Sequence, residues 1–300
     1  MRHGAAIPPG GLILLALLSI GWGLNWPIMK LVVAELPRLS FRGMCLIPAA
    51  VGMFAIARAT GQSLRVPRGR WGQLAGLALT NIVGWNVFAV YGVSLLPSGR
   101  AAILGYTMPL WSVLLSHWLL DESLTKRRIV GLLLGMAAMG LLLSAELRSL
   151  GSAPYGVLCM LAAAFCWGLG VVIYKRDPLD LPVSVLTAWQ MLLGGAPILV
   201  AALAFEAIDW SRVGFWPRFG LGYNILVAFL FCYWAWNRIV QMMPVAVASI
   251  GSLIVPVVGV FSGMAILGEV PRWQDYIALA LVLGSLATVM LPARRSADQP

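Results

Sequence analysis

Tryptophans and asparagines at helical spacing are the side chains of this sequence best suited to binding a small polar molecule. Asn25 lies three residues after Trp22, and Asn81 lies four residues before Trp85. On a helix, this spacing places each amide on the same face as an aromatic ring. Such a face can line a wet cavity, or its amide can instead join two helices through a hydrogen bond. We predict the cavity role for the two amides, and with them for Trp85, with helix association as the alternative.

A further tryptophan, Trp167, begins a helix similar to that of Trp22, with glycines close to both residues. A symmetric pair of tryptophans suits an aromatic wall around a twofold axis. The competing role is packing, because small residues let helices approach closely and tryptophan anchors helices at the membrane interface. The sequence leaves these two roles open for Trp22 and Trp167. Trp273, at the end of an apolar run, is better explained as an anchor.

Pro109 and Pro256 lie inside two other apolar runs. A proline within a helix lacks an N–H group and frees the carbonyl four residues earlier. The carbonyls freed in this way are those of Gly105 and Ser252. The two prolines can act as hinges, or as static kinks whose freed groups are satisfied by neighbouring helices.

Catalytic and metal-binding patterns are missing from the sequence. A metal-assisted hydrolase would need histidines and a glutamate in ligand spacing, but the chain holds only two histidines, His3 and His117, and its four cysteines form no C-x-x-C pair. No serine lies in a G-x-S-x-G setting. All eleven acidic residues fall in predicted loops or helix ends, so none is placed to carry a coupled proton through the membrane. We expect no enzymatic activity, no metal and no cofactor, and we expect any transport to be passive.

The composition shows which elements position these residues. Hydrophobic residues make up 60% of the chain and charged residues only 11%, against roughly 25% charged in soluble domains. Apolar side chains can face lipid when every backbone polar group is paired within a helix. The formal charge of +10 is better explained by basic cytoplasmic loops than by nucleic acid, because the basic residues lie between apolar runs. A β-barrel is excluded by the consecutive apolar residues 132–143.

Apolar runs of about 17 to 25 residues predict membrane-spanning helices. We expect ten of them, at residues 11–33, 41–58, 74–93, 101–120, 129–144, 155–174, 183–205, 221–240, 245–267 and 276–291. Thirteen of the 21 Lys and Arg residues then fall on the side of the N-terminus. This excess favours cytoplasmic N- and C-termini.

The chain repeats itself internally. Three residue pairs are each 147 positions apart: Pro97 and Pro244, Pro109 and Pro256, and Glu122 and Glu269. Near the start of each half, Trp22, Gly23 and Lys30 match Trp167, Gly168 and Lys175 at a separation of 145.

The number of helices per half determines the orientation of the second copy. Five is an odd number, so the second copy crosses the membrane in the opposite sense. We expect an all-α integral membrane protein of ten transmembrane helices in two inverted five-helix repeats, 1–147 and 148–300. Such repeats place a binding site near the midplane and allow one half to rock against the other in alternating access.

Several segments resemble the EamA-type drug/metabolite transporter family. GWGLNWPIMK, from Gly21, resembles the first-helix pattern of the family, and FRGMC, from Phe41, resembles the arginine-containing start of its second helix. Residues 89–143 are similar to the stretch from the third to the fifth helix, and residues 240–291 repeat that stretch. The spacing of 13 positions from Pro109 to Glu122 recurs from Pro256 to Glu269.

The resemblance implies a central cavity lined by the first, third and fourth helices of each half. It adds weaker lining candidates from these helices: Tyr106, Trp111, Trp234 and Ser252. It also implies the export of amino acids and related metabolites. In two places the sequence departs from the family pattern. Asp121–Glu122 replaces the usual Gly-Glu, and Gln190 lies near the place where the first half has Arg42; both departures are expected outside the cavity centre.

These observations predict a multi-pass transporter of the inner (plasma) membrane that exports or facilitates the passage of small zwitterionic metabolites, chiefly amino acids. Its partners are the small-molecule substrate and the lipid bilayer, without nucleic acid; a monomer fits the sequence, which does not fix the oligomeric state. The zwitterionic cargo is expected because a lone buried charge is costly in a membrane and none is placed at the centre of a span. Drugs, lipophilic cations, nucleotide sugars and a non-transporting membrane scaffold remain as alternatives.

Overall fold

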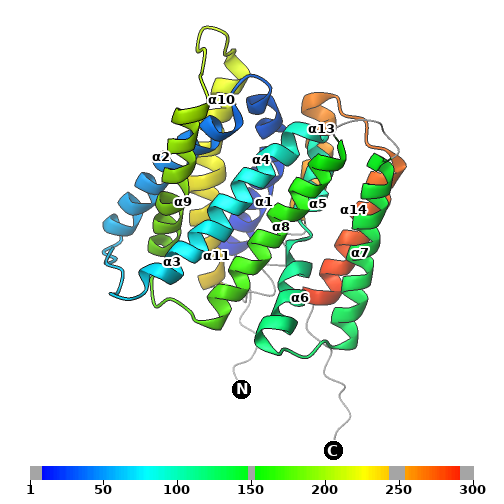
Figure 1. Ribbon diagram of the computed structural model, residues 1–300, viewed down its shortest axis with the longest axis horizontal. Helices are drawn as coiled ribbons and strands as arrows, with labels where there is room; N and C mark the ends of the chain where they lie inside the picture. The colour runs from blue at the N-terminus through cyan, green and yellow to red at the C-terminus, as the bar shows by residue number, and fades with distance from the viewer. Residues whose placement is uncertain (1–8, 148–152, 243–253, 291–300) are drawn as a thin grey trace, which may run out of the picture.

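The computed structural model of the protein describes residues 9–147, 153–242 and 254–290, and this part of the chain is all-helical without strands (Figure 1). Seven helical stretches are long and apolar enough to cross a membrane, and shorter apolar helices lie at residues 129–142 and 254–267. The predicted fold class, an all-α membrane protein, is confirmed. The exact count of ten spans stays a prediction, since residues 245–253 of the ninth lie outside the described ranges.

The first repeat contains α1 (Pro9–Val33), α2 (Arg38–Ala59), α3 (Trp71–Leu77), the π-helical η1 (Ala78–Gly84), α4 (Trp85–Leu95), α5 (Ser98–Gly105), α6 (Met108–Leu120) and α7 (Lys126–Leu147). The second contains α8 (Ala153–Arg176), α9 (Val183–Phe205), α10 (Phe215–Tyr223), the π-helical η2 (Asn224–Phe231), α11 (Cys232–Met242), α13 (Ile254–Leu267) and α14 (Trp273–Met290). α1 begins and α14 ends at the same end of the bundle (Figure 1). The stretch predicted to begin at residue 221 begins at Phe215 instead, because Pro217 is tolerated in a first helical turn.

The third helical stretch of each repeat widens into a π-helix. Shifting η1 by the 147 residues of the internal repeat gives residues 225–231, which fall within η2. An asparagine side chain donates to the carbonyl four residues earlier at each π segment, in both cases at 2.9 Å: Asn86, just after η1, from Nδ2 to Ile82 O, and Asn224, the first residue of η2, from Nδ2 to Gly220 O. The two repeats therefore share a local backbone feature that the apolar pattern did not predict.

The most extensive helix pairings join one repeat to the other: α2 with α9, α7 with α14, α4 with α8, and α1 with α13. Glycines allow the close approach. A Cβ atom added to Gly23 of α1 would lie 2.4 Å from Val258 of α13, and one added to Gly43 of α2 would lie 2.8 Å from Leu199 of α9. The repeats thus interlock and do not form separate bundles, and the rocking of one half against the other stays a prediction.

Carboxylates from one repeat accept hydrogen bonds from helix N-termini of the other. Glu206 accepts from the backbone N–H groups of Leu39 and Ser40 at 3.1 and 2.7 Å, at the start of α2. Glu269 accepts from the N–H of Ser98 at 2.7 Å, at the start of α5. The first N–H groups of a helix have no partner within it, and the positive end of the helix dipole favours an anion there. These bonds connect the repeats at one end of the bundle.

Glu206→Gln is expected to lower the stability of the protein by about 1–2 kcal/mol, because the amide keeps an acceptor oxygen but loses the charge that favours the start of α2. The measurement is the apparent melting temperature of the purified protein in detergent. The control is Asp209→Asn, an exposed carboxylate paired with Arg212 three residues later, which should change the melting temperature little. Equal melting temperatures for both variants would contradict the role assigned to Glu206.

Candidate functional site

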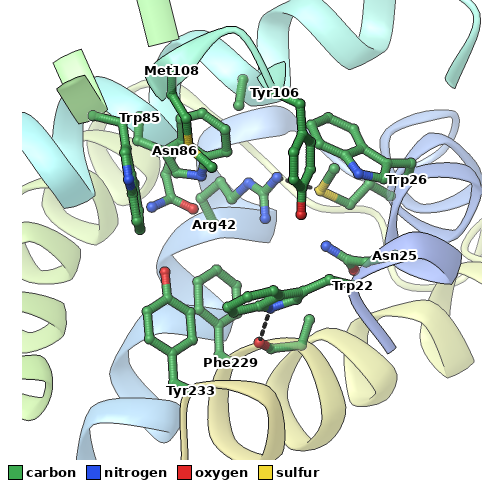
Figure 2. A pocket seen from close by; sticks show the side chains of 14 residues that line it. Trp22, Asn25, Trp26, Arg42, Trp85, Asn86, Tyr106, Met108, Phe229 and Tyr233 are labelled. Carbon is green, nitrogen blue, oxygen red and sulfur yellow. Dashed lines mark hydrogen bonds between the residues drawn. The ribbon is translucent and has the colours of Figure 1, made fainter. Parts of the chain in front are cut away.

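A cavity of about 110 Å³ lies at the centre of the molecule, between helices of both repeats (Figure 2). Its walls come from α1, α2, α4, α6, α8, η2, α11 and the turn between α5 and α6. The lining residues are Trp22, Asn25, Trp26, Met29, Arg42, Trp85, Asn86, Ala89, Tyr106, Met108, Trp167, Ala228, Phe229 and Tyr233. By volume, the cavity holds several water molecules, and it is smaller than the roughly 300–1,000 Å³ typical of pockets for drug-sized ligands.

Five residues proposed from the sequence line this cavity: Trp22, Asn25, Trp85, Tyr106 and Trp167. Their contact with cargo remains a prediction. The structure places three other candidates among neighbouring helices instead. Asn81 packs against Gly170 of α8, the Trp111 ring meets Phe165 edge-on with centroids 5.5 Å apart, and Trp234 packs against the buried cluster that contains Leu15 and Leu18 of α1. Ser252 is outside the described residues.

Sequence reasoning missed several lining residues. Trp26 and Met29 lie four and seven residues after Trp22, so helical spacing alone could have added them to the same face. Asn86 directly follows Trp85, and successive residues of a helix do not share a face, so its position could not be read from spacing. Arg42 required the packing of α2 against α1 and η2.

The aromatic residues form two pairs that each join the repeats. Trp22 of the first repeat meets Tyr233 of the second edge-on, with centroids 5.7 Å apart. Trp167 of the second meets Trp85 of the first in the same way at 5.3 Å. The indole N–H of Trp22 donates to the Ala228 carbonyl at 3.0 Å, so this ring is fixed in place (Figure 2). Both tryptophans thus line the cavity and pack against the opposite repeat, each with a different aromatic partner, and a role of this wall in transport stays a prediction.

Polar groups without partners face the same space. The hydroxyl groups of Tyr106 and Tyr233 point into it from opposite sides (Figure 2). In the described part of the chain, the Oδ1 atoms of Asn25 and Asn86 are buried without a hydrogen-bond partner. The Asn86 amide group is oriented by its bond to Ile82, which uses the nitrogen and leaves the oxygen to accept. Unpaired buried polar groups are costly, and a polar ligand in the cavity would supply hydrogen bonds to the Asn25 and Asn86 oxygens.

Arg42 also lines the cavity and is 3% exposed (Figure 2). The expectation that this residue lies away from the cavity, and that the cavity holds no fixed charge, is wrong. Its guanidinium carbon lies 4.7 Å from the centre of the Phe41 ring and 5.9 Å from that of Phe229. Aromatic faces stabilise a cation through their quadrupole, which helps to offset the cost of burying the charge.

The sequence suggested that Pro109 lies inside a continuous helix, but the structure shows a break there. α5 ends at Gly105, Tyr106 and Thr107 form a turn, and Pro109 follows in the first turn of α6. A missing N–H group costs nothing at that position. The break sets the direction in which Tyr106 enters the cavity. Pro256 lies near the start of the described part of α13, and the hinge role of both prolines stays a prediction.

A second cavity, of about 420 Å³, lies where α1, α4 and α13 end and α5 and α14 begin. Four of its charged side chains, those of Lys30, Arg100, Glu269 and Asp275, have partners. Arg100 and Asp275 form a buried ion pair at 2.7 Å, Lys30 Nζ donates to the Val93 carbonyl at 3.1 Å near the end of α4, and Glu269 accepts from the start of α5. Because these charged side chains already bond to other parts of the protein, they are not free to bind a ligand. The central cavity is therefore the better candidate for the ligand site.

Comparison with known proteins gives a consistent result. The model of the EamA-like transporter family matches residues 9–144 and 154–291. An uncharacterized transporter, YoaV of Bacillus subtilis strain 168, is 27% identical over 280 residues, covering 91% of this chain and 93% of that protein. A probable amino-acid metabolite efflux pump of Salmonella typhimurium is 25% identical over 280 residues, covering 90% and 91%. A solved crystal structure shares the fold, with a TM-score of 0.66, 24% identity and coverage of 95% and 99%.

We expect the central cavity to be accessible to water and the packed core not to be. Met108 lines the cavity, whereas Met53 is fully buried among core side chains. In a background without native cysteines, Met108→Cys is expected to react with a small water-soluble thiosulfonate several times faster than Met53→Cys. Mass spectrometry of the purified protein in detergent measures the modification. Similar rates for both cysteines would mean that the cavity is not hydrated.

Proposed function

We propose that this chain, which belongs to the EamA-like transporter family, exports small zwitterionic metabolites, chiefly amino acids, by alternating access. The chain is a multi-pass membrane transporter, and the observation that carries the finer proposal is the central cavity. Side chains of both repeats line it, and its walls combine aromatic faces with buried amide oxygens that have no hydrogen-bond partner. Its small volume favours a cargo of few atoms over a nucleotide sugar or a large drug.

The cargo class follows from what these walls can bind. A zwitterion needs acceptors for its ammonium group and donors for its carboxylate, and it presents a side chain of variable size. Tryptophan and tyrosine faces attract the ammonium group through cation–π contacts worth about 0.5–2 kcal/mol each. The name of the Salmonella relative, a probable amino-acid metabolite efflux pump, supports the same class. A lipophilic cation is disfavoured because Arg42 would repel it.

Alternating access requires that contacts between the repeats break at one end while they hold at the other. The repeat-related glutamates Glu122 and Glu269 make such contacts at opposite ends. Glu122 of the first repeat pairs with Lys175 of the second, and Glu269 of the second bonds to Ser98 of the first. Because the repeats interlock, we propose that the moving units combine helices of both repeats. Pro109 and Pro256 remain the candidate hinges.

We propose passive transport, as a uniport or an exchange of cargo, in the inner membrane with both termini cytoplasmic. No acidic side chain is among the described residues that line the central cavity, so a carboxylate that alternates between proton and cargo is not part of the proposal. A monomer can perform this transport, because one chain supplies both walls of the cavity.

Replacing a cavity tryptophan should impair the flux of several amino acids together. Trp22→Ala or Trp167→Ala is expected to reduce initial uptake of labelled leucine, phenylalanine and threonine by about tenfold, because an aromatic contact worth about 1–2 kcal/mol is lost. Uptake is measured in liposomes that contain matched amounts of each folded variant. The control Trp273→Ala changes a ring that is 62% exposed at the start of α14, and its flux should stay near that of the wild type. Normal flux in both cavity variants would contradict the proposed site.

A pH gradient tests the passive mechanism. Accumulation of labelled leucine inside liposomes should stop at its external concentration, with or without an imposed gradient, because no cavity carboxylate titrates with the cargo. The comparison is the uptake plateau with and without the gradient. Uphill accumulation that a proton ionophore abolishes would show proton coupling and overturn this part of the proposal.

A further inference from the structure

Arg42 is a buried cation without an anionic partner. Among the residues that the structure describes, no carboxylate lies within 4.0 Å of its guanidinium group. Its Nε atom is buried without an acceptor, and its one hydrogen bond within the described ranges is from Nη2 to the Met29 sulfur. A thioether is a weak acceptor, whereas a guanidinium group carries five N–H donors. Most of the hydrogen-bonding capacity of Arg42 is therefore unused.

The fold does not account for a cation at this position. Arg42 lies in the second turn of α2, near the positive end of the helix dipole, which gives a cation no stabilisation. The other arginine that is buried in the described part of the chain, Arg100 at the second cavity, has a carboxylate partner in Asp275. In the second repeat the neutral Gln190 lies near the corresponding place, so the repeated architecture itself does not need the charge. An uncompensated ion in a membrane interior is costly, and its retention in the cavity wall points to a ligand.

We propose that Arg42 binds the carboxylate group of the cargo in the central cavity. This inference rests on the proposed function and deepens it, because it assigns a recognition group to one end of the zwitterion. The guanidinium plane can hold both carboxylate oxygens through two parallel N–H···O bonds. Phe41 and Phe229 lie against the cation and keep it in the wall without neutralising it.

The opposite end of the cargo meets neutral groups. The amide of Asn25 and the hydroxyl of Tyr106 face the same space as the guanidinium group (Figure 2). Both can accept a hydrogen bond from an ammonium group, but neither carries a charge. The carboxylate is therefore the required group of the cargo and the ammonium a helpful one. A monocarboxylate without an amino group should bind, and an amino acid amide should not.

Three probes of nearly equal size separate these requirements: L-leucine, leucinamide without the carboxylate, and 4-methylpentanoate without the ammonium group. The full-length protein is tested in liposomes for uptake of labelled leucine in the presence of each unlabelled compound. Ligand-induced rise of the melting temperature in detergent gives a second readout that does not need transport. The wild type should be inhibited and stabilised by leucine and by 4-methylpentanoate, and leucinamide should do neither.

Variants of Arg42 test the assignment directly. Arg42→Gln is expected to raise the KM for leucine about 10- to 100-fold, because charge-assisted hydrogen bonds to the carboxylate are lost. Arg42→Lys should give an intermediate value, since a lysine keeps the charge but not the bidentate geometry. The matched control is Arg38→Gln, one turn earlier on α2, where the side chain bonds to Ser94 outside the cavity. This control should keep the KM of the wild type.

The outcomes separate the two proposals. Transport of leucine with an unchanged KM in Arg42→Gln would overturn the role of Arg42 and leave the amino acid exporter standing. A wild type that ignores leucine but is stabilised by 4-methylpentanoate, and not by leucinamide, would overturn the cargo and support the carboxylate site. A wild type that leucinamide inhibits or stabilises as well as leucine does, or that no carboxylate stabilises, would overturn the site even if every Arg42 variant failed to fold.

Discussion

A lipid bilayer offers no water to pair with backbone N–H and C=O groups, and this constraint decides where the helices of the protein begin, widen and end. Glu206 and Glu269 accept from the first N–H groups of α2 and α5. Lys30 donates to carbonyls near the end of α4. Asn86 reaches back to a carbonyl beside the π segment η1. These polar side chains near the helix ends and the π segment therefore serve to pair backbone N–H and C=O groups.

The same constraint explains how much of the fold could be predicted. A helix that faces lipid must be apolar over its whole length, so apolar runs such as residues 183–205 located their helices without tertiary information. The identical spacing of Pro109 to Glu122 and of Pro256 to Glu269 revealed the repeat. The cavity was predicted less well, because residues such as Trp111 and Trp234 point to neighbouring helices, which only packing determines. Arg42 was misplaced because its sequence position, at a helix start, suggested an exposed end.

Because helices pair across the repeats, the two copies of the duplicated sequence do not pack as two independent units. α1 with α13 and α2 with α9 each combine one helix from each copy, so neither copy has a complete core of its own. The ligand cavity arises at the same contacts, since Trp22 and Trp167 each meet an aromatic residue of the opposite repeat. The hydrophobic core and the cavity therefore depend on the same contacts between the repeats, and neither repeat alone contains the whole cavity.

The π segments determine which face of the following helix points toward the cavity. Each residue beyond the normal α-helical number turns the rest of the helix by about 100° around its axis. The faces of α4 and α11 that meet the cavity are therefore set by the length of η1 and η2 as well as by side-chain identity. Deleting one residue within 78–84 would leave a helix of spanning length, but it would turn Trp85 and Asn86 away from the cavity. In this architecture, the residue count of η1 determines which side chains of α4 face the cavity, although no residue of η1 lines it.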